Sequence, residues 1–174
     1  HFVHNLDVGG GFSGIRYTRM GVQGQSLSTG TYGESGNADI AHGGVASFAT
    51  SASDRSVMIS FLRSGAALFP EFRVVNVDGG MSWSTAALVK GGETYVDRLP
   101  GLERWGDYTG IARRHNSTDP RTWSAGSAGA NVAGQIDGHD IFISTGKTDG
   151  GRITLWRMQD LPIASVSRFV TEPP

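Results

Sequence analysis

The chain has 174 residues, a length typical of one domain, and its 26 glycines with only 38% hydrophobic residues indicate a turn-rich β protein rather than one with long helices. A formal charge of −1 gives no field that would recruit nucleic acid or an acidic membrane, and no apolar run reaches the roughly 20 residues that span a bilayer. The lack of cysteine excludes disulfides, thiolate metal sites and a cysteine nucleophile, although it leaves the cellular compartment open.

The first predicted element is a β-hairpin at the N-terminus. Residues 2–5 and 15–20 are its strands, and the glycine-rich residues 7–11 are its turn. Ile15 and Tyr17 alternate with polar neighbours, as expected for a strand with one buried face. The glycine run is followed by neither the Lys-Ser/Thr pair nor the helix of a phosphate loop, so we expect a plain hairpin turn.

Two groups of four short strands follow the hairpin, each strand bounded by Gly, Asp, Asn or Ser. The first group is predicted at residues 45–50, 57–63, 72–77 and 86–90. The second group is predicted at residues 109–113, 122–127, 140–144 and 152–158. A four-stranded unit that recurs at roughly 40–50 residues is typical of a β-propeller blade. A β-sandwich also has short strands, but it would not explain the repeated layout.

The predicted fold is therefore all-β, with antiparallel four-stranded blades that form a partial β-propeller of about three blades within residues 1–169. A blade buries its faces only against neighbouring blades, and closed propellers have about four or more. We expect missing sequence or another chain to complete the ring, and the start at His1 without a methionine predicts a fragment of a longer polypeptide. Residues 170–174, which end in Thr-Glu-Pro-Pro, are expected to begin a linker.

Residues 76–83, Asn-Val-Asp-Gly-Gly-Met-Ser-Trp, fit the Asp-box pattern Ser-x-Asp-x-Gly-x-Thr-Trp, with Asn and Ser as mild departures. The residues of this box are Asn76, Asp78, Gly80 and Trp83. We expect the Asp78 carboxylate to accept backbone N–H bonds across the hairpin, Gly80 to supply backbone freedom, and Trp83 to pack between sheets. This structural role is favoured over a catalytic or ligand-binding role.

The most specific segment is residues 104–110, Arg-Trp-Gly-Asp-Tyr-Thr-Gly, in which two large rings and charged donors flank a small turn. The two arginines at 113–114 are suited to clamp a carboxylate or phosphate, although a solvated face is the favoured interpretation. The candidate binding or structural residues are Arg104, Trp105, Asp107, Tyr108, Arg113 and Arg114. We expect Asp107 to accept turn N–H bonds, Arg104 to reach a carbonyl or carboxylate, and the two rings to fill space between blades.

Together with residues 69–71 (Phe-Pro-Glu) and 89–92 (Val-Lys-Gly-Gly), the two motifs resemble the C-terminal blades of secreted bacterial sialidase-like (BNR/Asp-box) β-propeller proteins. The resemblance covers residues 38–147. It implies an extracellular or cell-surface propeller of roughly six to eight blades. Such propellers are often part of a large multidomain exported protein.

The resemblance also raises the question of whether the chain has sialidase activity. Sialidases use three arginines to bind the substrate carboxylate, a tyrosine nucleophile activated by a glutamate, and an aspartate as the acid/base. The chain has these residue types at Arg16, Arg19, Arg63, Glu103, Arg104, Asp107 and Tyr108. However, their arrangement does not match, and the Arg-Ile-Pro motif that opens a sialidase domain is absent from the sequence. No catalytic residue is therefore predicted, and a fragment of a sialidase-type glycoside hydrolase is kept as an alternative.

The predicted function is a non-enzymatic exported or cell-surface module for adhesion, scaffolding or partner binding, with a carbohydrate-binding propeller as a further alternative. The expected partner is the rest of the propeller or another protein chain, with a glycan as the candidate ligand, and neither nucleic acid nor membrane insertion is expected. The five histidines lack the spacing of a zinc motif, so no cofactor is predicted. Calcium at an Asp-Gly turn is kept as an alternative, although no turn has the acidic ladder of an EF-hand.

Overall fold

The computed structural model describes residues 1–97, 100–101, 105–106, 109–114, 121–131, 138–147 and 154–157, the last two ranges by their backbone. All regular structure in this part of the chain is β-strand, arranged in three antiparallel sheets, and this part contains no helix. The prediction of an all-β, antiparallel protein is thus confirmed.

The first sheet consists of β1 (Phe2–Gly9), β2 (Phe12–Met20) and β3 (Leu27–Tyr32), in that order. β1 and β2 form the predicted hairpin, and its turn is a run of three glycines, residues 9–11, that all have positive φ. Glycine adopts such φ values at little cost because it has no Cβ. The turn is shorter than predicted because β1 extends to Gly9.

The third strand of this sheet was not predicted from the sequence. β3 reads Leu-Ser-Thr-Gly-Thr-Tyr, and its small polar residues are more typical of a loop than of a strand. It forms because it pairs with β2 over its whole length, from Ile15 opposite Tyr32 to Met20 opposite Leu27. Pairing with a neighbouring strand therefore overrides the local sequence preference.

Both predicted groups of four strands are present as four-stranded sheets. The second sheet contains β4 (Asp39–Ser47), β5 (Val57–Gly65), β6 (Leu68–Val77) and β7 (Ala87–Lys90) in chain order. The third sheet contains β8 (Gly110–Arg113), β9 (Arg121–Ala130), β10 (Gly138–Lys147) and β11 (Thr154–Arg157), again with sequential neighbours paired. The strand predicted at residues 45–50 instead begins at Asp39, because a bulge between Ala41 and Gly44 lets its glycine-rich start pair with β5.

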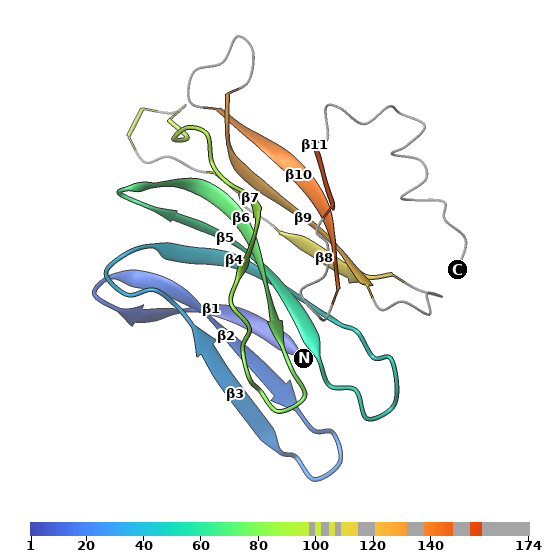
Figure 1. The fold of residues 1–174 in the computed structure, drawn as a ribbon. Helices are drawn as coiled ribbons and strands as arrows, with labels where there is room; N and C mark the ends of the chain where they lie inside the picture. The colour runs from blue at the N-terminus through green and yellow to red at the C-terminus, as the bar shows by residue number, and fades with distance from the viewer. Residues whose placement is uncertain are drawn as a thin grey trace.

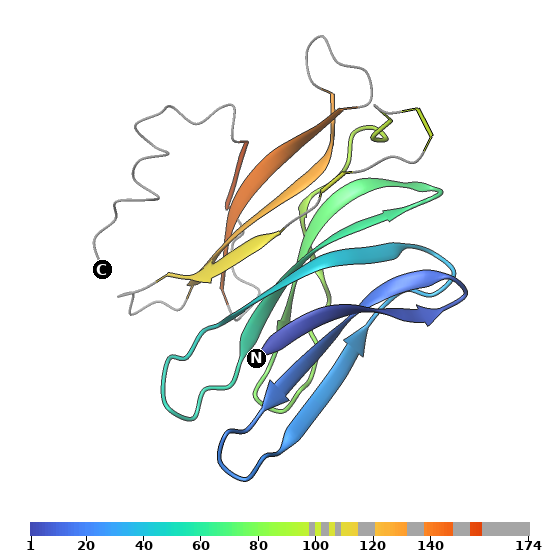
Figure 2. The same cartoon turned by 180° about the vertical axis from the view of Figure 1, so that it is seen from behind.

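The three sheets are stacked face to face in chain order (Figure 1), and the view from behind shows the same layers (Figure 2). The first sheet contacts the second through β4, and β4, β5 and β6 of the second sheet contact β8 and β9 of the third. One apolar cluster between the first and second sheets includes Ile15, Tyr17, Ile40, Val57, Ile59, Phe61, Val75 and Val77. A second cluster includes Phe48, Met58, Leu62, Phe72, Val74 and Val89, and Trp105 and Ile111 pack against it.

The side chains of β5 alternate between these two clusters, so that this strand is buried on both faces. Val57, Ile59 and Phe61 lie in the first cluster, whereas Met58 and Leu62 lie in the second. Burying one such side chain contributes roughly 1.5–3 kcal/mol. The described sheets form an open stack rather than a closed ring, and residues 170–174, where a linker is predicted, lie outside the described residues.

The contact between the second and third sheets is close because β9 carries small residues. A Cβ added to Gly126 would lie 2.5 Å from the ring of Phe72, which is completely buried. The hydroxyl of Thr122, also completely buried, lies 3.0 Å from the sulfur of Met58. At Gly126, the third sheet can therefore lie this close to Phe72 because β9 has no side chain there.

We predict that Gly126→Ala lowers the free energy of unfolding by roughly 1–3 kcal/mol, because the added methyl group overlaps an immobile ring. Urea unfolding measures this effect. Gly110→Ala is the matched control, since a Cβ there meets no atom within 4 Å, and we expect a change below about 0.5 kcal/mol. Equal stability of the two variants would contradict the close packing of β9 against β6.

Candidate functional site

The segment predicted at residues 104–110 lies where the chain enters the third sheet. Its described residues are Trp105, Gly106, Thr109 and Gly110. Trp105 is half-buried and packs against the apolar cluster that contains Leu62 and Phe72. Arg104, Asp107 and Tyr108 lie outside the described residues, so their roles stay predictions.

Gly106 holds the middle of this segment between β5 and β9. Its φ is 61°, a left-handed conformation that side-chain-bearing residues rarely adopt. A Cβ at this position would overlap Leu62 Cδ1 and lie 3.0 Å from Ser127 Oγ. The glycine is therefore required both by its backbone conformation and by the space around it.

Thr109 ties the end of the segment to the second sheet. Its hydroxyl donates a hydrogen bond of 2.5 Å to the carbonyl of His42, in the β4 bulge. It also accepts a hydrogen bond of 3.2 Å from the hydroxyl of Ser60 in β5. Thr109 thus fixes the start of the third sheet against the second, through contacts that the sequence did not reveal.

The two predicted arginines after this segment lie near the start of the β8–β9 connection. Arg113 is the last residue of β8, and the N–H of Arg114 donates to the carbonyl of Arg121 at 2.9 Å. Both arginines are half-buried rather than fully exposed. A role in clamping an anion stays a prediction.

The Asp-box forms the turn between β6 and β7, the last two strands of the second sheet. One carboxylate oxygen of Asp78 accepts the N–H of Gly80 and the N–H of Ser82, each at 2.8 Å. The N–H of Asp78 donates to the carbonyl of Ser82 at 3.0 Å, and Val77 pairs with Trp83 in an isolated bridge. The expectation that Asp78 bonds backbone N–H groups across the hairpin is confirmed.

The prediction that Gly80 supplies the backbone freedom of this turn is wrong. The residue with positive φ in this turn is Met81, at 73°, and Gly80 does not have a positive φ. A Cβ on Gly80 would lie 3.3 Å from the Asp78 carboxylate oxygen, so the glycine makes room for that oxygen. The remaining residue of the box, Asn76, bonds Ser84 twice: its carbonyl accepts the backbone N–H of Ser84 at 2.9 Å, and its own backbone N–H donates to the Ser84 hydroxyl at 3.0 Å.

Trp83 packs between the first and second sheets, as the sequence predicts. Its ring meets Tyr17 edge-on, with centroids 6.3 Å apart, and stacks on Tyr32 at 5.7 Å. A Cβ added to Gly30 of β3 would lie 2.7 Å from the indole nitrogen. Such aromatic pairs add about 0.5–1.5 kcal/mol beyond the area that they bury.

The sequence did not reveal that Arg19 fastens the Asp-box to the first sheet. Its guanidinium donates to the carbonyls of Asp78 at 3.0 Å and Gly79 at 2.8 Å, and also to that of Arg55 at 3.1 Å. Its Nε lies 3.3 Å from the hydroxyl of Tyr17. The sequence did place Arg19 on the inner face of the strand, because it shares the strand alternation of Ile15 and Tyr17.

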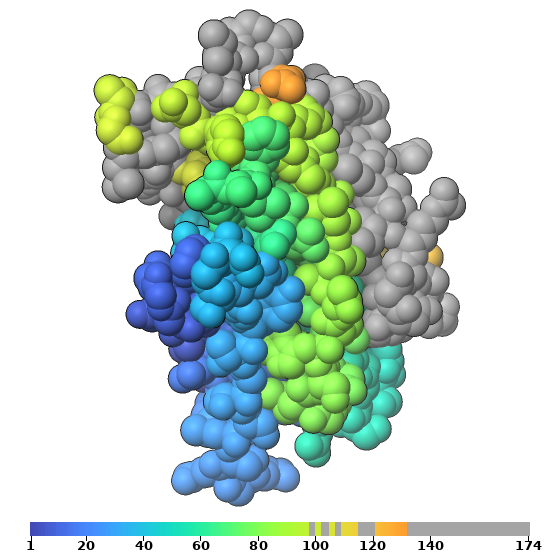
Figure 3. Space-filling model, turned by 60° about the vertical axis from the view of Figure 1, so that its left-hand side comes forward, coloured from blue at the N-terminus to red at the C-terminus, as the bar shows by residue number. Residues whose placement is uncertain are grey.

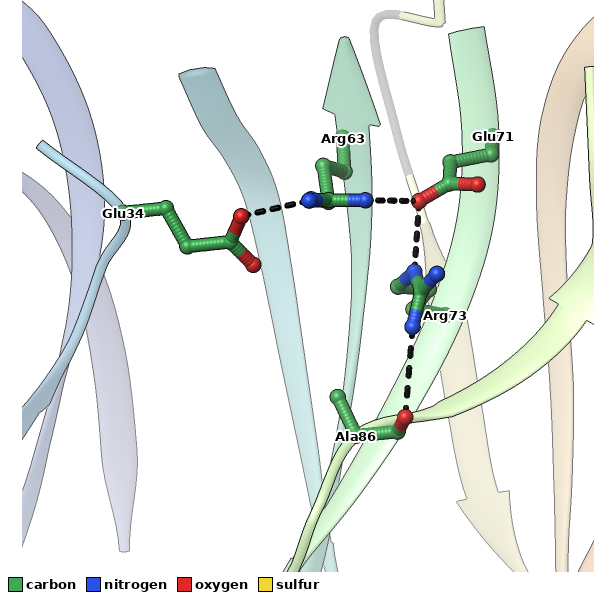
Figure 4. Close-up of polar contacts among 5 residues, drawn as sticks. All are labelled: Glu34, Arg63, Glu71, Arg73 and Ala86. Atoms are coloured by element: carbon green, nitrogen blue, oxygen red, sulfur yellow. Dashed lines mark hydrogen bonds and ion pairs between the residues drawn. The ribbon is translucent and has the colours of Figure 1, made fainter. Parts of the chain in front are cut away.

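A second polar group that sequence reasoning missed is the charge network of Glu34, Arg63, Glu71 and Arg73 (Figure 4). Arg63 donates to Glu34 at 2.5 Å and to Glu71 at 2.6 Å, while the Nε of Arg73 donates to the same Glu71 oxygen at 2.5 Å. Arg73 also donates to the carbonyl of Ala86 at 3.2 Å. One pair of this network was predictable from the sequence, because Glu71 and Arg73 are two residues apart in one strand and therefore share a face.

The network balances two carboxylates with two guanidinium groups. Burial lowers the pKa of Arg63, but hydrogen bonds to Glu34 and Glu71 outweigh it and raise the pKa above the usual arginine value. Burial, followed by the neighbouring Glu34 carboxylate, raises the pKa of the Tyr32 hydroxyl. The arginine therefore stays charged and the tyrosine stays protonated, which is typical of a structural cluster rather than of an activated nucleophile.

No group of three or more His, Cys, Asp or Glu residues suited to a metal ion occurs within the part of the chain that the structure describes. The calcium alternative stays a prediction. Among the same residues there is no helix with the length and apolar character needed to cross a membrane.

Comparisons of the chain with protein-family models, with curated proteins and with solved structures found no match.

We predict that Asp78→Ala lowers the free energy of unfolding by roughly 1–3 kcal/mol, because two backbone N–H groups lose their acceptor. Asp78→Asn is the control, since an amide oxygen accepts the same two bonds without the charge, and we expect it to keep most of the stability. Thermal unfolding of both variants separates hydrogen bonding from charge. A loss of equal size in both would rule out hydrogen bonding as the main role of the carboxylate.

We predict that Glu71→Gln lowers stability by roughly 1–3 kcal/mol, because two arginines in a mostly buried cluster lose their shared counter-charge. Glu93→Gln is the matched control. Glu93 pairs with Lys90 at a more exposed site, where side-chain exposure is 37% against 6% for Glu71, so we expect a loss below about 1 kcal/mol. Chemical unfolding measures both variants, and a larger effect at Glu93 would contradict the network's role.

Proposed function

We propose that the chain is a run of three successive blades of a sialidase-like (BNR/Asp-box) β-propeller from an exported bacterial protein. In this proposal it is a non-enzymatic module for adhesion, scaffolding or partner binding, located outside the cell or at the cell surface. One observation supports the non-enzymatic role in this proposal. The buried arginine and glutamate side chains described above form hydrogen bonds to each other and to backbone carbonyls. Further sequence or another chain completes the ring.

The layout of the sheets supports the propeller. Consecutive sheets stack face to face, each is built from strands that are sequential neighbours, and two of the three have four strands. The Asp-box connects the third and fourth strands of its sheet, and its tryptophan packs against the neighbouring sheet. Radial repetition of four-stranded sheets is the architecture of a propeller.

The positions of the arginines and of Tyr32 favour a structural module over a sialidase. A sialidase site needs several arginines free to bind a substrate carboxylate. Here Arg19 bonds backbone carbonyls, and Arg63 and Arg73 bond Glu71. Tyr32, which lies beside Glu34, has a raised pKa rather than the lowered pKa of an activated nucleophile.

Glycan binding is a second candidate, favoured by one exposed aromatic pair. The rings of Phe69 and Tyr95 meet edge-to-face at 4.6 Å, and their exposed fractions are 38% and 48%. The Tyr95 hydroxyl donates to the carbonyl of Ala66, which holds the ring in place. Exposed, oriented rings of this kind offer an apolar surface with a polar edge, which suits a sugar ring.

We predict that the complete gene product that contains this chain does not hydrolyse a fluorogenic sialoside above the buffer rate, with a commercial sialidase as the positive control. Turnover that disappears in Tyr108→Phe, with unchanged thermal unfolding, would contradict the non-enzymatic proposal and favour the hydrolase alternative. The same preparation on a glycan array tests the second candidate. Binding that is lost in Tyr95→Ala or Trp105→Ala would assign it a carbohydrate ligand.

A further inference from the structure

We infer that the outer face of the first sheet packs against another antiparallel sheet, which lies outside residues 1–174 and presents apolar side chains and a carboxylate. The outer face is defined by Phe2, His4, Arg16, Met20, Leu27 and Thr31. Strand alternation places these side chains opposite to Ile15 and Tyr17, which are buried against the second sheet. The inference rests on the proposed propeller and specifies how it continues.

The outer face exposes several large apolar side chains close together. The exposed fractions are 44% for Phe2, 57% for Met20 and 64% for Leu27. Met20 and Leu27 are directly paired across β2 and β3, and Phe2 is paired with Thr18 two residues before Met20. The hairpin that joins β2 and β3 projects from the molecule (Figure 3) and carries Val22, which is 90% exposed. Grouped apolar side chains of this kind mark an interaction surface.

The stack itself indicates what kind of partner fits. The second sheet is covered on both faces by neighbouring sheets, whereas the first sheet contacts another described sheet on its inner face alone, through β4. Three twisted strands match the curvature of another twisted sheet, and such packing buries alternate residues of both partners. A further sheet would therefore continue the packing already present twice in the described part of the chain.

The charges on the outer face specify the partner further. Arg16 and His4 lie on this face, and the one polar contact described for the Arg16 side chain is a long 3.5 Å bond to Thr31. Asp7 is the single acidic residue of β1, β2 and β3, and it faces inward with Ser13. Since a basic group buried by a partner needs a counter-charge, the opposing sheet is expected to supply a carboxylate.

A second copy of this chain is a poorer partner. Two outer faces placed together would bring Arg16 and His4 of each copy to the same interface. The strands of the third sheet contain the basic residues Arg113, Arg121, Lys147 and Arg157 but one acidic residue, Asp140. With one acidic residue in its four strands, the third sheet of a second copy is therefore a poor source of the expected carboxylate.

The test is photo-crosslinking in the complete product of the reading frame that encodes this sequence, with p-benzoylphenylalanine in place of Leu27. We expect crosslinks to a strand peptide outside residues 1–174 that contains Asp or Glu. The matched control carries the crosslinker in place of Leu88, which is 48% exposed but lies on β7 of the second sheet, and should not reach the same peptide. Crosslinks to residues 1–174 of a second copy, or none at all, would overturn the inference.

A charge reversal tests the carboxylate separately. Arg16→Glu should reduce the Leu27 crosslink by about tenfold, which corresponds to about 1.4 kcal/mol, whereas Arg55→Glu, an equal charge change at an exposed position, should leave it unchanged. An equal reduction in both variants would overturn the specific pairing. Sialoside turnover is measured on the same protein, so that failure of the docking inference remains distinguishable from failure of the non-enzymatic proposal.

Discussion

The fold depends on the burial of β5 from both sides. Val57, Ile59 and Phe61 pack toward the first sheet, whereas Met58 and Leu62 pack toward the third. A strand that is apolar on both faces gains its stability only when two other sheets cover it. The second sheet therefore specifies a stack of at least its two neighbours, and the remaining features of the structure hold those layers in register.

Two groups of polar contacts hold these layers at defined positions. Arg19 joins the first sheet to the Asp-box of the second through backbone carbonyls, and Glu71 gathers Arg63 and Arg73 into a network that reaches Glu34. Apolar packing alone is non-directional, whereas hydrogen bonds to charged groups have defined geometry. The charges thus stabilise one arrangement of the sheets, which explains how residue types known from catalytic sites serve a structural role here.

The hairpin and both four-stranded groups were predictable because their signals are local: alternation, β-branched residues and Asp-Gly turns. β3 was not, because its Ser-Thr-Gly sequence becomes a strand only by pairing with β2. The Asp78 bonds followed from the motif, but the positive φ fell on Met81 rather than Gly80. The charge network was missed because its members Glu34 and Arg63, 29 residues apart, meet only after the sheets stack.

In the proposed propeller, this stack is part of a ring rather than a finished three-layer protein. The most direct measurement is the structure of the complete gene product by crystallography or electron cryomicroscopy. The expected result is a closed ring of roughly four to eight four-stranded sheets in which the first sheet is covered on both faces. A structure in which the outer face of the first sheet, with Phe2, Met20 and Leu27, remains in contact with solvent would contradict the claim.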